Sequence, residues 1–178
     1  MNDKKKNASN VFTKKCMVTA LMQLMEEKPF SNISITEITN RAGVSRMAYY
    51  RNYKSKEDIF RTYLKDILDV YYQESLADHQ NGHYYDIVHL EHCFKSMECH
   101  KDFINSLFKG GLGNILLEGF GRYMAETWYK GNDIREYYEL ESFAGALYNV
   151  FIAWAGRGKK ESSRQMAGIM HSIYVKET

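Results

Sequence analysis

Hydrophobic residues near the start of the chain recur at the period of an α-helix. From Phe12 onward, apolar side chains fall at positions i, i+3, i+4 and i+7, namely Val18, Leu21, Met22 and Met25. This spacing predicts a helix with one apolar face, which Pro29 ends. The polar residues 1–9 precede it, and we expect them to be disordered.

Residues 34–53 carry a dense series of helix start and stop signals. Ser34 and Glu37 have the spacing of a capping box, in which each side chain bonds the other's backbone N–H. Gly43 predicts the end of that helix, because glycine tolerates the left-handed backbone of a helix terminus. Ser45 follows as the cap of a further helix. The stretch therefore predicts helix, tight turn and helix, which is the helix-turn-helix arrangement.

Helical periodicity continues through the rest of the chain, and we find no convincing strand and no repeat. Ser55 and Asp58 predict the start of a helix that runs to about Asp78, and a break follows at 78–83. Further helices are expected at about 85–100, then up to Phe108, 115–130, 134–155, and from a capping box at Ser162 and Gln165 onward. The prediction is an all-α protein of about nine helices, with an N-terminal three-helix domain and a C-terminal helical bundle.

Charge is distributed unevenly along the 178 residues. Residues 1–60 hold eleven Lys and Arg against six Asp and Glu, whereas residues 61–178 hold thirteen against sixteen. A basic front end favours a polyanionic partner such as nucleic acid. Hydrophobic residues make up 44% of the chain, which is enough for a real core.

The three cysteines, Cys16, Cys93 and Cys99, follow neither a disulfide nor a metal-binding pattern. No apolar run approaches the ~18 residues that a membrane span needs, and no signal peptide is recognisable. These features predict a cytoplasmic protein that does not contact a membrane.

The segment SITEITNRAGVSRMAYYRNYKSKEDIF at 34–60 resembles the DNA-binding segment of the tetracycline-repressor (TetR/AcrR) family of transcriptional regulators. The likeness includes the cap, the Ala-Gly-Val-Ser turn at 42–45, Tyr50 and the Lys-x-Lys-Glu run at 54–57. The resemblance implies a helix-turn-helix domain over residues 1–60 and a regulatory and dimerisation domain over residues 61–178. The chain departs from the family pattern at Thr39, Met47, Tyr49, Asn52 and Tyr53.

The resemblance also implies which side chains bind DNA. Arg46 and Met47 are the candidates for base edges, since arginine can grip guanine through two hydrogen bonds and methionine can touch a thymine methyl. The Lys56 ammonium and the N-terminus of its helix are expected to act on one phosphate. The full predicted set is Thr36, Ser45, Arg46, Met47, Ala48, Tyr50, Asn52, Lys54 and Lys56.

Two further surfaces are predicted in the C-terminal part. Polar-tipped aromatic and histidine side chains stand where a simple core would prefer leucine, and they favour a small-molecule pocket lined by Tyr71, His89, His92, Tyr123 and Trp128. The last two helices carry more apolar residues than one inner face can hide. This predicts a dimer interface at Phe143, Leu147, Phe151, Trp154, Met166, Ile169, Met170 and Ile173.

No catalytic motif, metal site or cofactor is predicted. The ligand-type residues of HLEHC at 89–93 lack a closing pair, and the glycine-rich 109–114 follows no strand. The sequence therefore predicts a non-enzymatic regulator, in its simplest form a dimeric repressor that binds a palindromic operator and is released by a small effector. An activator or a regulator controlled by a protein partner stays open, as does a helical scaffold that does not bind DNA.

Overall fold

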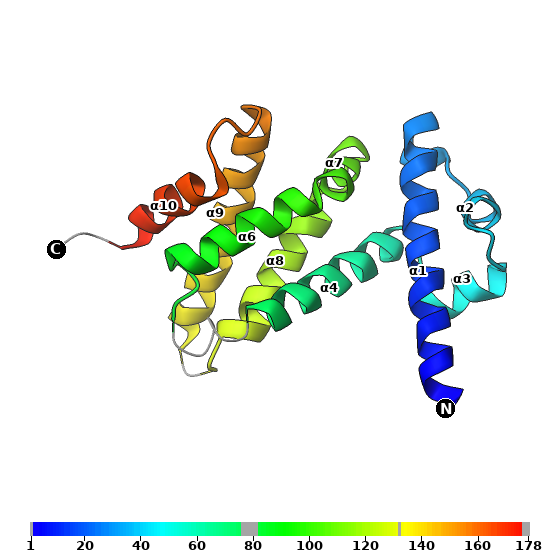
Figure 1. Ribbon diagram of the computed structural model, residues 1–178, viewed down its shortest axis with the longest axis horizontal. Coiled ribbons are helices and arrows are strands. Elements are labelled where there is room, and N and C mark those ends of the chain that lie inside the picture. Colours follow the sequence, from blue (N-terminus) through cyan, green and yellow to red (C-terminus); the bar gives the residue numbers. More distant parts are fainter. Residues whose placement is uncertain (1, 76–81, 132, 176–178) are drawn as a thin grey trace. The chain divides into compact units, whose positions relative to one another are not determined.

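The computed structural model describes residues 2–75, 82–131 and 133–175, and within these ranges the chain is helical and contains no strand (Figure 1). The all-α prediction is thereby confirmed. The described helices are α1 (Asn2–Glu27), a 3-10 turn η1 (Phe30–Asn32), α2 (Ile35–Ala42), α3 (Arg46–Asn52), α4 (Glu57–Glu74), α6 (Ile87–Cys99), α7 (Lys101–Lys109), α8 (Gly113–Trp128), α9 (Ile134–Gly156) and α10 (Ser163–Tyr174).

The chain folds into two compact units, which we describe separately. Unit 1 contains residues 1–66 together with 105–115, and unit 2 contains residues 67–104 together with 116–178. Helices α4, α7 and α8 therefore each begin in one unit and end in the other. The domain boundary predicted at residue 60 stays a prediction.

Helix α1 is longer than the sequence pattern indicated. It begins at Asn2, whereas residues 1–9 were expected to be disordered and the helix to start near Phe12. No glycine or proline occurs before Pro29, so nothing in the local sequence forces an earlier break. Its apolar face is buried as predicted at Val18, Leu21 and Met25.

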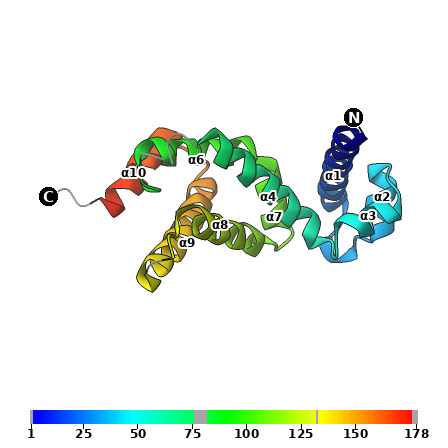
Figure 2. The same ribbon diagram turned by 90° about the horizontal axis from the view of Figure 1, so that it is seen from below.

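The predicted caps form around α2 and α3, which lie beside α1 within unit 1 in both views (Figures 1 and 2). The Glu37 N–H donates to Ser34 Oγ over 3.3 Å, and the Ser34 N–H donates to Glu37 Oε2 over 2.9 Å. Gly43 ends α2 with φ of 66°, and the Ala48 N–H donates to Ser45 Oγ over 3.1 Å. These local bonds fix the turn between the two helices.

Unit 2 has a core in which aromatic rings meet edge to face. Phe94 of α6 contacts Trp154 of α9 with ring centroids 5.4 Å apart, and Phe151 lies 6.0 Å from the same indole. Helices α6 and α10 lie side by side, as both views show (Figures 1 and 2). The predicted capping box of Ser162 and Gln165 starts α10. The predicted break at 78–83 lies mostly outside the described residues.

A search of the described helices finds none that is both long enough and apolar enough to span a bilayer.

Candidate nucleic-acid interface

The inner side of α3 anchors this short helix to unit 1. Tyr49 is fully buried and Tyr53, which caps the C-terminus of α3, is 4% exposed, with their rings 5.6 Å apart. Both aromatic residues bury their rings beneath the helix. Thr39 of α2 is also buried, and its hydroxyl donates to the Thr36 carbonyl over 3.1 Å. Thr39, Tyr49 and Tyr53, three of the departures from the family pattern, are therefore packed inside unit 1.

The outer side of α3 presents cationic and amphipathic side chains to solvent. Met47 is 76% exposed and Tyr50 is 60% exposed, although both carry large apolar groups. Arg46 and Lys54 are exposed as well. Arg51 shares this face but was absent from the predicted set, although its spacing of i+4 from Met47 could have identified it.

Several of the predicted DNA-contacting residues have polar partners inside the chain. The Arg46 guanidinium donates to the Thr36 hydroxyl, so it bridges the start of α3 to the start of α2. The Asn52 side-chain amide donates to the Ala48 carbonyl over 2.7 Å. Thr36, Ala48 and Asn52 are half-buried.

The N-terminus of α4 is occupied by a carboxylate of its own first turn. Asp58 Oδ2 accepts from the Lys54 N–H over 2.9 Å and from the Ser55 N–H over 3.1 Å. Ser55 Oγ in turn accepts from the Asp58 N–H over 3.3 Å, so the predicted cap is confirmed. Glu57 adds a second acidic side chain to the same turn. This helix end therefore carries two negative charges where a phosphate was expected.

The Lys56 ammonium, which was predicted to bind a phosphate, lies on backbone carbonyls of the same chain. It donates to Phe30 O over 2.9 Å and to Ile33 O over 2.6 Å, with Ser31 O at 3.4 Å. It also lies 4.7 Å from the centre of the Phe30 ring. Sequence spacing placed Lys56 at a helix start correctly but could not indicate the direction of its side chain.

Three consecutive charged residues at the end of α1 each pair with a different partner. Glu26 pairs with Lys109 of α7, and Lys28 pairs with Glu37 of α2. The third, Glu27, pairs with Arg41 of α2 through two N–O contacts of 2.8 and 3.1 Å. These ion pairs hold α2 and the end of α7 against α1. The hydrogen bond from Lys28, followed by those from Ser34, lowers the pKa of Glu37 to about 2.

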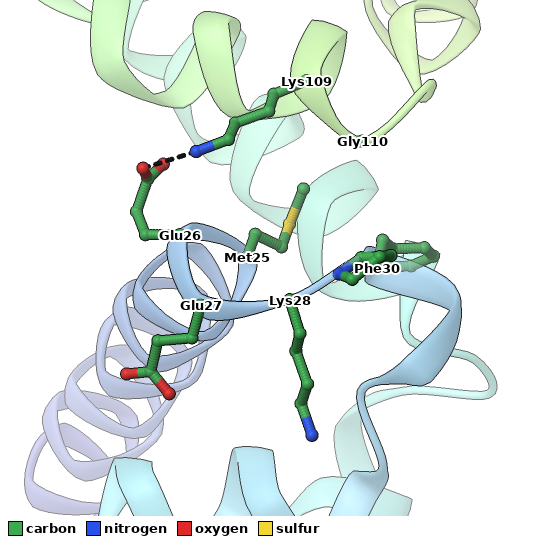
Figure 3. Close-up of a pocket in the computed structure, with 8 residues that line it drawn as sticks. Met25, Glu26, Glu27, Lys28, Phe30, Lys109 and Gly110 are labelled. Atoms are coloured by element: carbon green, nitrogen blue, oxygen red, sulfur yellow. Dashed lines mark hydrogen bonds and ion pairs between the residues drawn. The ribbon is translucent and has the colours of Figure 1, made fainter.

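A pocket of about 340 Å³ lies at this end of α1 (Figure 3). Met25 points toward Gly110 on the wall of the pocket, whereas the Glu27 and Lys28 side chains, which also line the pocket, point away from Gly110 (Figure 3). A methyl group added at Gly110 would come within 2.5 Å of Met25 Cε, so the two chain segments pack closely there. The pocket is in unit 1 and does not involve the five residues predicted to bind a ligand.

Those five residues do come together in unit 2. The Tyr71 hydroxyl lies 3.2 Å from His89 Nε2, and the Tyr71 ring lies 4.8 Å from the His92 ring. Tyr123 lies 5.6 Å from Tyr71, and Trp128 lies 5.5 Å from His89, measured between ring centres. We call Tyr71, His89, His92, Tyr123 and Trp128 the aromatic cluster.

Burial suppresses the ionisation of Tyr123 in the aromatic cluster and of Cys93, which hydrogen-bonds to Tyr71 of the cluster. Burial raises the pKa of the Cys93 thiol to about 12 and also raises the pKa of Tyr123 above its ordinary value. Cys93 and His89 were weighed as metal ligands from the sequence. In the described part of the chain, no three His, Cys, Asp or Glu side chains gather as they would around a metal ion.

The residues predicted as a dimer interface are mostly buried inside the chain itself. The buried ones, all at most 6% exposed, are Phe143, Leu147, Phe151, Trp154, Met166 and Met170. They pack in the core of unit 2, so a second copy could not reach them. Only Ile169, at 49% exposed, and Ile173, at 60%, face solvent.

Comparison with known proteins assigns the class of the N-terminal part. Residues 18–63 match the family model of bacterial regulatory proteins of the tetR family. One similar solved structure is described as a TetR-family transcriptional regulator from Syntrophomonas wolfei. It superposes with a TM-score of 0.59 at 16% sequence identity, over 91% of this chain and 92% of that chain. A second solved structure, described as a Clostridium perfringens fatty acid metabolism regulator, superposes with a TM-score of 0.53 at 17% sequence identity. The match covers 88% of this chain and 95% of that chain.

The helix-turn-helix segment and the helical bundle thus have the fold of a tetR-family transcriptional regulator. The resemblance of the sequence to the TetR family is confirmed, and it is strongest over residues 18–63, which match the tetR family model.

Proposed function

We propose that this protein is a dimeric transcriptional repressor that binds a palindromic DNA operator and leaves it when a small-molecule effector binds. The observation that carries the proposal is the exposed face of the capped helix α3. This face presents Arg46 and Arg51 together with the solvent-facing side chains of Met47 and Tyr50. An exposed Met47 beside an exposed Tyr50 contributes nothing to the core of unit 1. Such side chains suit the edges and backbone of a DNA groove.

Base reading is assigned to Arg46 and Met47. Arg46 stands in the first turn of α3, the part of a recognition helix that meets base edges. Its bond to Thr36 places the guanidinium at the junction of α2 and α3, from which it swings to a guanine when DNA binds. Met47 offers a flexible apolar tip to a thymine methyl group.

Phosphate contacts are assigned to Ser45, Tyr50, Arg51 and Lys54. Tyr50 is exposed and its phenol can donate to a phosphate oxygen while its ring leans 5.3 Å from the Tyr49 ring. Arg51 and Lys54 supply positive charge along the same side. These contacts fix the register of α3 in the groove and carry no base information.

Dimerisation is assigned to the outer faces of α9 and α10. A helix of seven residues covers few base pairs, so two copies related by a two-fold axis are needed to read a useful operator. The exposed apolar side chains on these helices are Ile134, Tyr138, Ile152, Ile169 and Ile173. Ile169 and Ile173 are spaced i and i+4, so they share one face of α10.

Release by a small molecule is assigned to the aromatic cluster. Its side chains come from α4, α6 and α8, and α4 continues along the chain into the DNA-binding unit. A ligand that packs against Tyr71 of α4 can therefore bias that helix. It changes operator affinity only by the difference between its affinities for the two states. A screen of metabolites for a raised melting temperature and a released operator tests this part.

The main test of the proposal is selection of bound sequences from a random double-stranded DNA pool. We expect enrichment of a palindrome with two half-sites about one helical turn apart. Mapping that sequence in the source genome, followed by expression measurement with and without the protein, distinguishes repression from activation. A helical scaffold without DNA function would enrich no sequence.

A further inference from the structure

The Lys56 ammonium sits in a cage of oxygen atoms inside unit 1. Two carbonyls, Phe30 O and Ile33 O, accept hydrogen bonds of 2.9 and 2.6 Å, and Ser31 O lies at 3.4 Å. The face of the Phe30 ring closes the cage at 4.7 Å. An ammonium group has three donors and no acceptor, so such a cage matches its full hydrogen-bonding capacity.

The cage forms at the 3-10 turn η1, which spans only Phe30–Asn32. The Phe30 carbonyl accepts from the Ile33 N–H over 3.2 Å, and the Lys56 ammonium is a second donor to the same oxygen. A positive charge beside these carbonyls is stabilising for the same reason that lysine is favoured at helix C-termini. Lys56 therefore holds the connector between α1 and α2 in one conformation.

The same contact fixes α4. Lys56 directly precedes α4, and the connector directly precedes α2, so one ammonium links the helices on either side of α3 along the chain. The ring of Phe30 lies 6.3 Å from that of Phe60 in the first turns of α4, which adds an apolar contact to the link. Helix α3 packs against α2 and is joined to α4 along the chain by residues 53–56.

The surroundings of Lys56 oppose a phosphate at this place. Asp58 already accepts the N–H groups of Lys54 and Ser55, and Glu57 adds a second acidic group to the turn. A phosphate here would meet two carboxylates and would have to draw the ammonium out of its cage. We propose that Lys56 is a positioning residue for DNA binding, which orients the recognition helix from within and touches no phosphate.

This inference rests on the proposed function for its DNA readout, and it is tested by replacing the ammonium while keeping the stem. Lys56→Met is compared with Lys54→Met, which removes an exposed ammonium two residues away. Operator affinity is measured over a series of salt concentrations, at a temperature where circular dichroism finds all variants folded. Amide hydrogen exchange is measured on the same proteins without DNA.

We expect Lys56→Met to raise the Kd about tenfold at every salt concentration, because a recognition helix that is no longer held in one orientation loses binding free energy. The slope of log Kd against log salt stays that of the wild type, because no counterion release is lost. Lys54→Met instead lowers the slope by about one for each bound protomer. Exchange speeds up at residues 30–33 and 46–52 in Lys56→Met and stays unchanged in α10.

A slope that falls by about one per protomer in Lys56→Met would overturn the inference, because it would show a lost phosphate contact. An unchanged Kd would also overturn it. If wild-type protein selects no duplex, the proposed function fails while the exchange data still test the cage: unchanged protection at residues 30–33 would refute it. A general loss of stability in Lys56→Met, seen as a lower melting temperature and faster exchange in α10 as well, would also contradict the inference, which expects unchanged exchange in α10.

Discussion

Arg46 and Met47 stand next to each other on α3 but would read DNA in different ways. The guanidinium recognises a hydrogen-bond pattern, whereas the thioether recognises a methyl group by contact. In the free protein Arg46 is bonded to Thr36, and Met47 is largely exposed. Specificity at the two positions is therefore expected to respond separately to substitution.

Arg46→Ala is expected to relax base preference at particular operator positions by about 1–3 kcal/mol, because a bidentate pair to guanine is lost. Competition binding with single-base operator variants measures the change. Tyr50→Phe serves as the control, since loss of a phosphate contact weakens binding to all sequences alike. An unchanged preference in Arg46→Ala would show that another residue reads those bases.

Tyr49 shows how a departure from the family pattern affects stability. Its side chain is fully buried, its pKa is raised by burial, and its hydroxyl has no hydrogen-bond partner among the described residues. Removing a buried hydroxyl of this kind is favourable. Tyr49→Phe is therefore expected to raise the free energy of unfolding by about 1 kcal/mol.

Urea denaturation checks the Tyr49→Phe prediction through the midpoint concentration. Tyr50→Phe is the matched control, because its hydroxyl is on an exposed side chain and its loss should change stability by less than about 0.5 kcal/mol. Destabilisation by Tyr49→Phe would mean that the hydroxyl does contribute to the native fold.

At the scale of the helices, stability around α2 depends on Glu37, which belongs to both a capping box and an ion pair. Its pKa falls from an ordinary 4.5 to about 2, first through the bond from Lys28 and then through those from Ser34. A carboxyl group with a lowered folded-state pKa stabilises the fold above its unfolded-state pKa. That stabilisation is lost as the pH falls from about 4.5 to about 2.

Glu37→Gln is therefore expected to be less stable than the wild type at pH 7, with a difference that shrinks as the pH falls through this window. Urea midpoints for both proteins between pH 7 and pH 2.5 measure the difference. Glu126→Gln, an exposed site on α8, controls for the loss of one negative charge. A difference that stays constant across the pH range would contradict the assigned role of the charge.

The helix boundaries followed from sequence wherever the bonds that set them are local. Ser34, Gly43, Ser45 and Ser162 each act within four residues along the chain, so spacing alone identified them. The direction of the Lys56 side chain could not be identified this way. Its partners lie 23 to 26 residues earlier, and only the folded chain brings them together.

At the scale of the whole molecule, the predicted dimer interface shows what helical periodicity leaves undetermined. The pattern on α9 and α10 correctly marked an apolar face, but that face serves the core of unit 2, as Phe143 and Trp154 illustrate. Periodicity does not say whether the covering surface belongs to the same chain. The exposed Ile169 and Ile173 are the part of the prediction that the proposed dimer keeps.

Light scattering at micromolar concentration should give about twice the chain mass of 20.8 kDa. A double substitution, Ile169→Asp with Ile173→Asp, should return the mass of a monomer, because two charges would be buried without partners in the interface. Ile134→Asp at the far end of α9 tests how far the interface extends. A wild-type mass of 20.8 kDa would contradict the proposed assembly.

The central claim is that the exposed face of α3 reads a DNA sequence. Its most direct test is the binding of a duplex selected from a random pool against a scrambled duplex of equal composition, at physiological salt. The account predicts at least about a thousandfold tighter binding to the selected palindrome and a Kd that rises steeply with salt. Equal affinity for the two duplexes would contradict it.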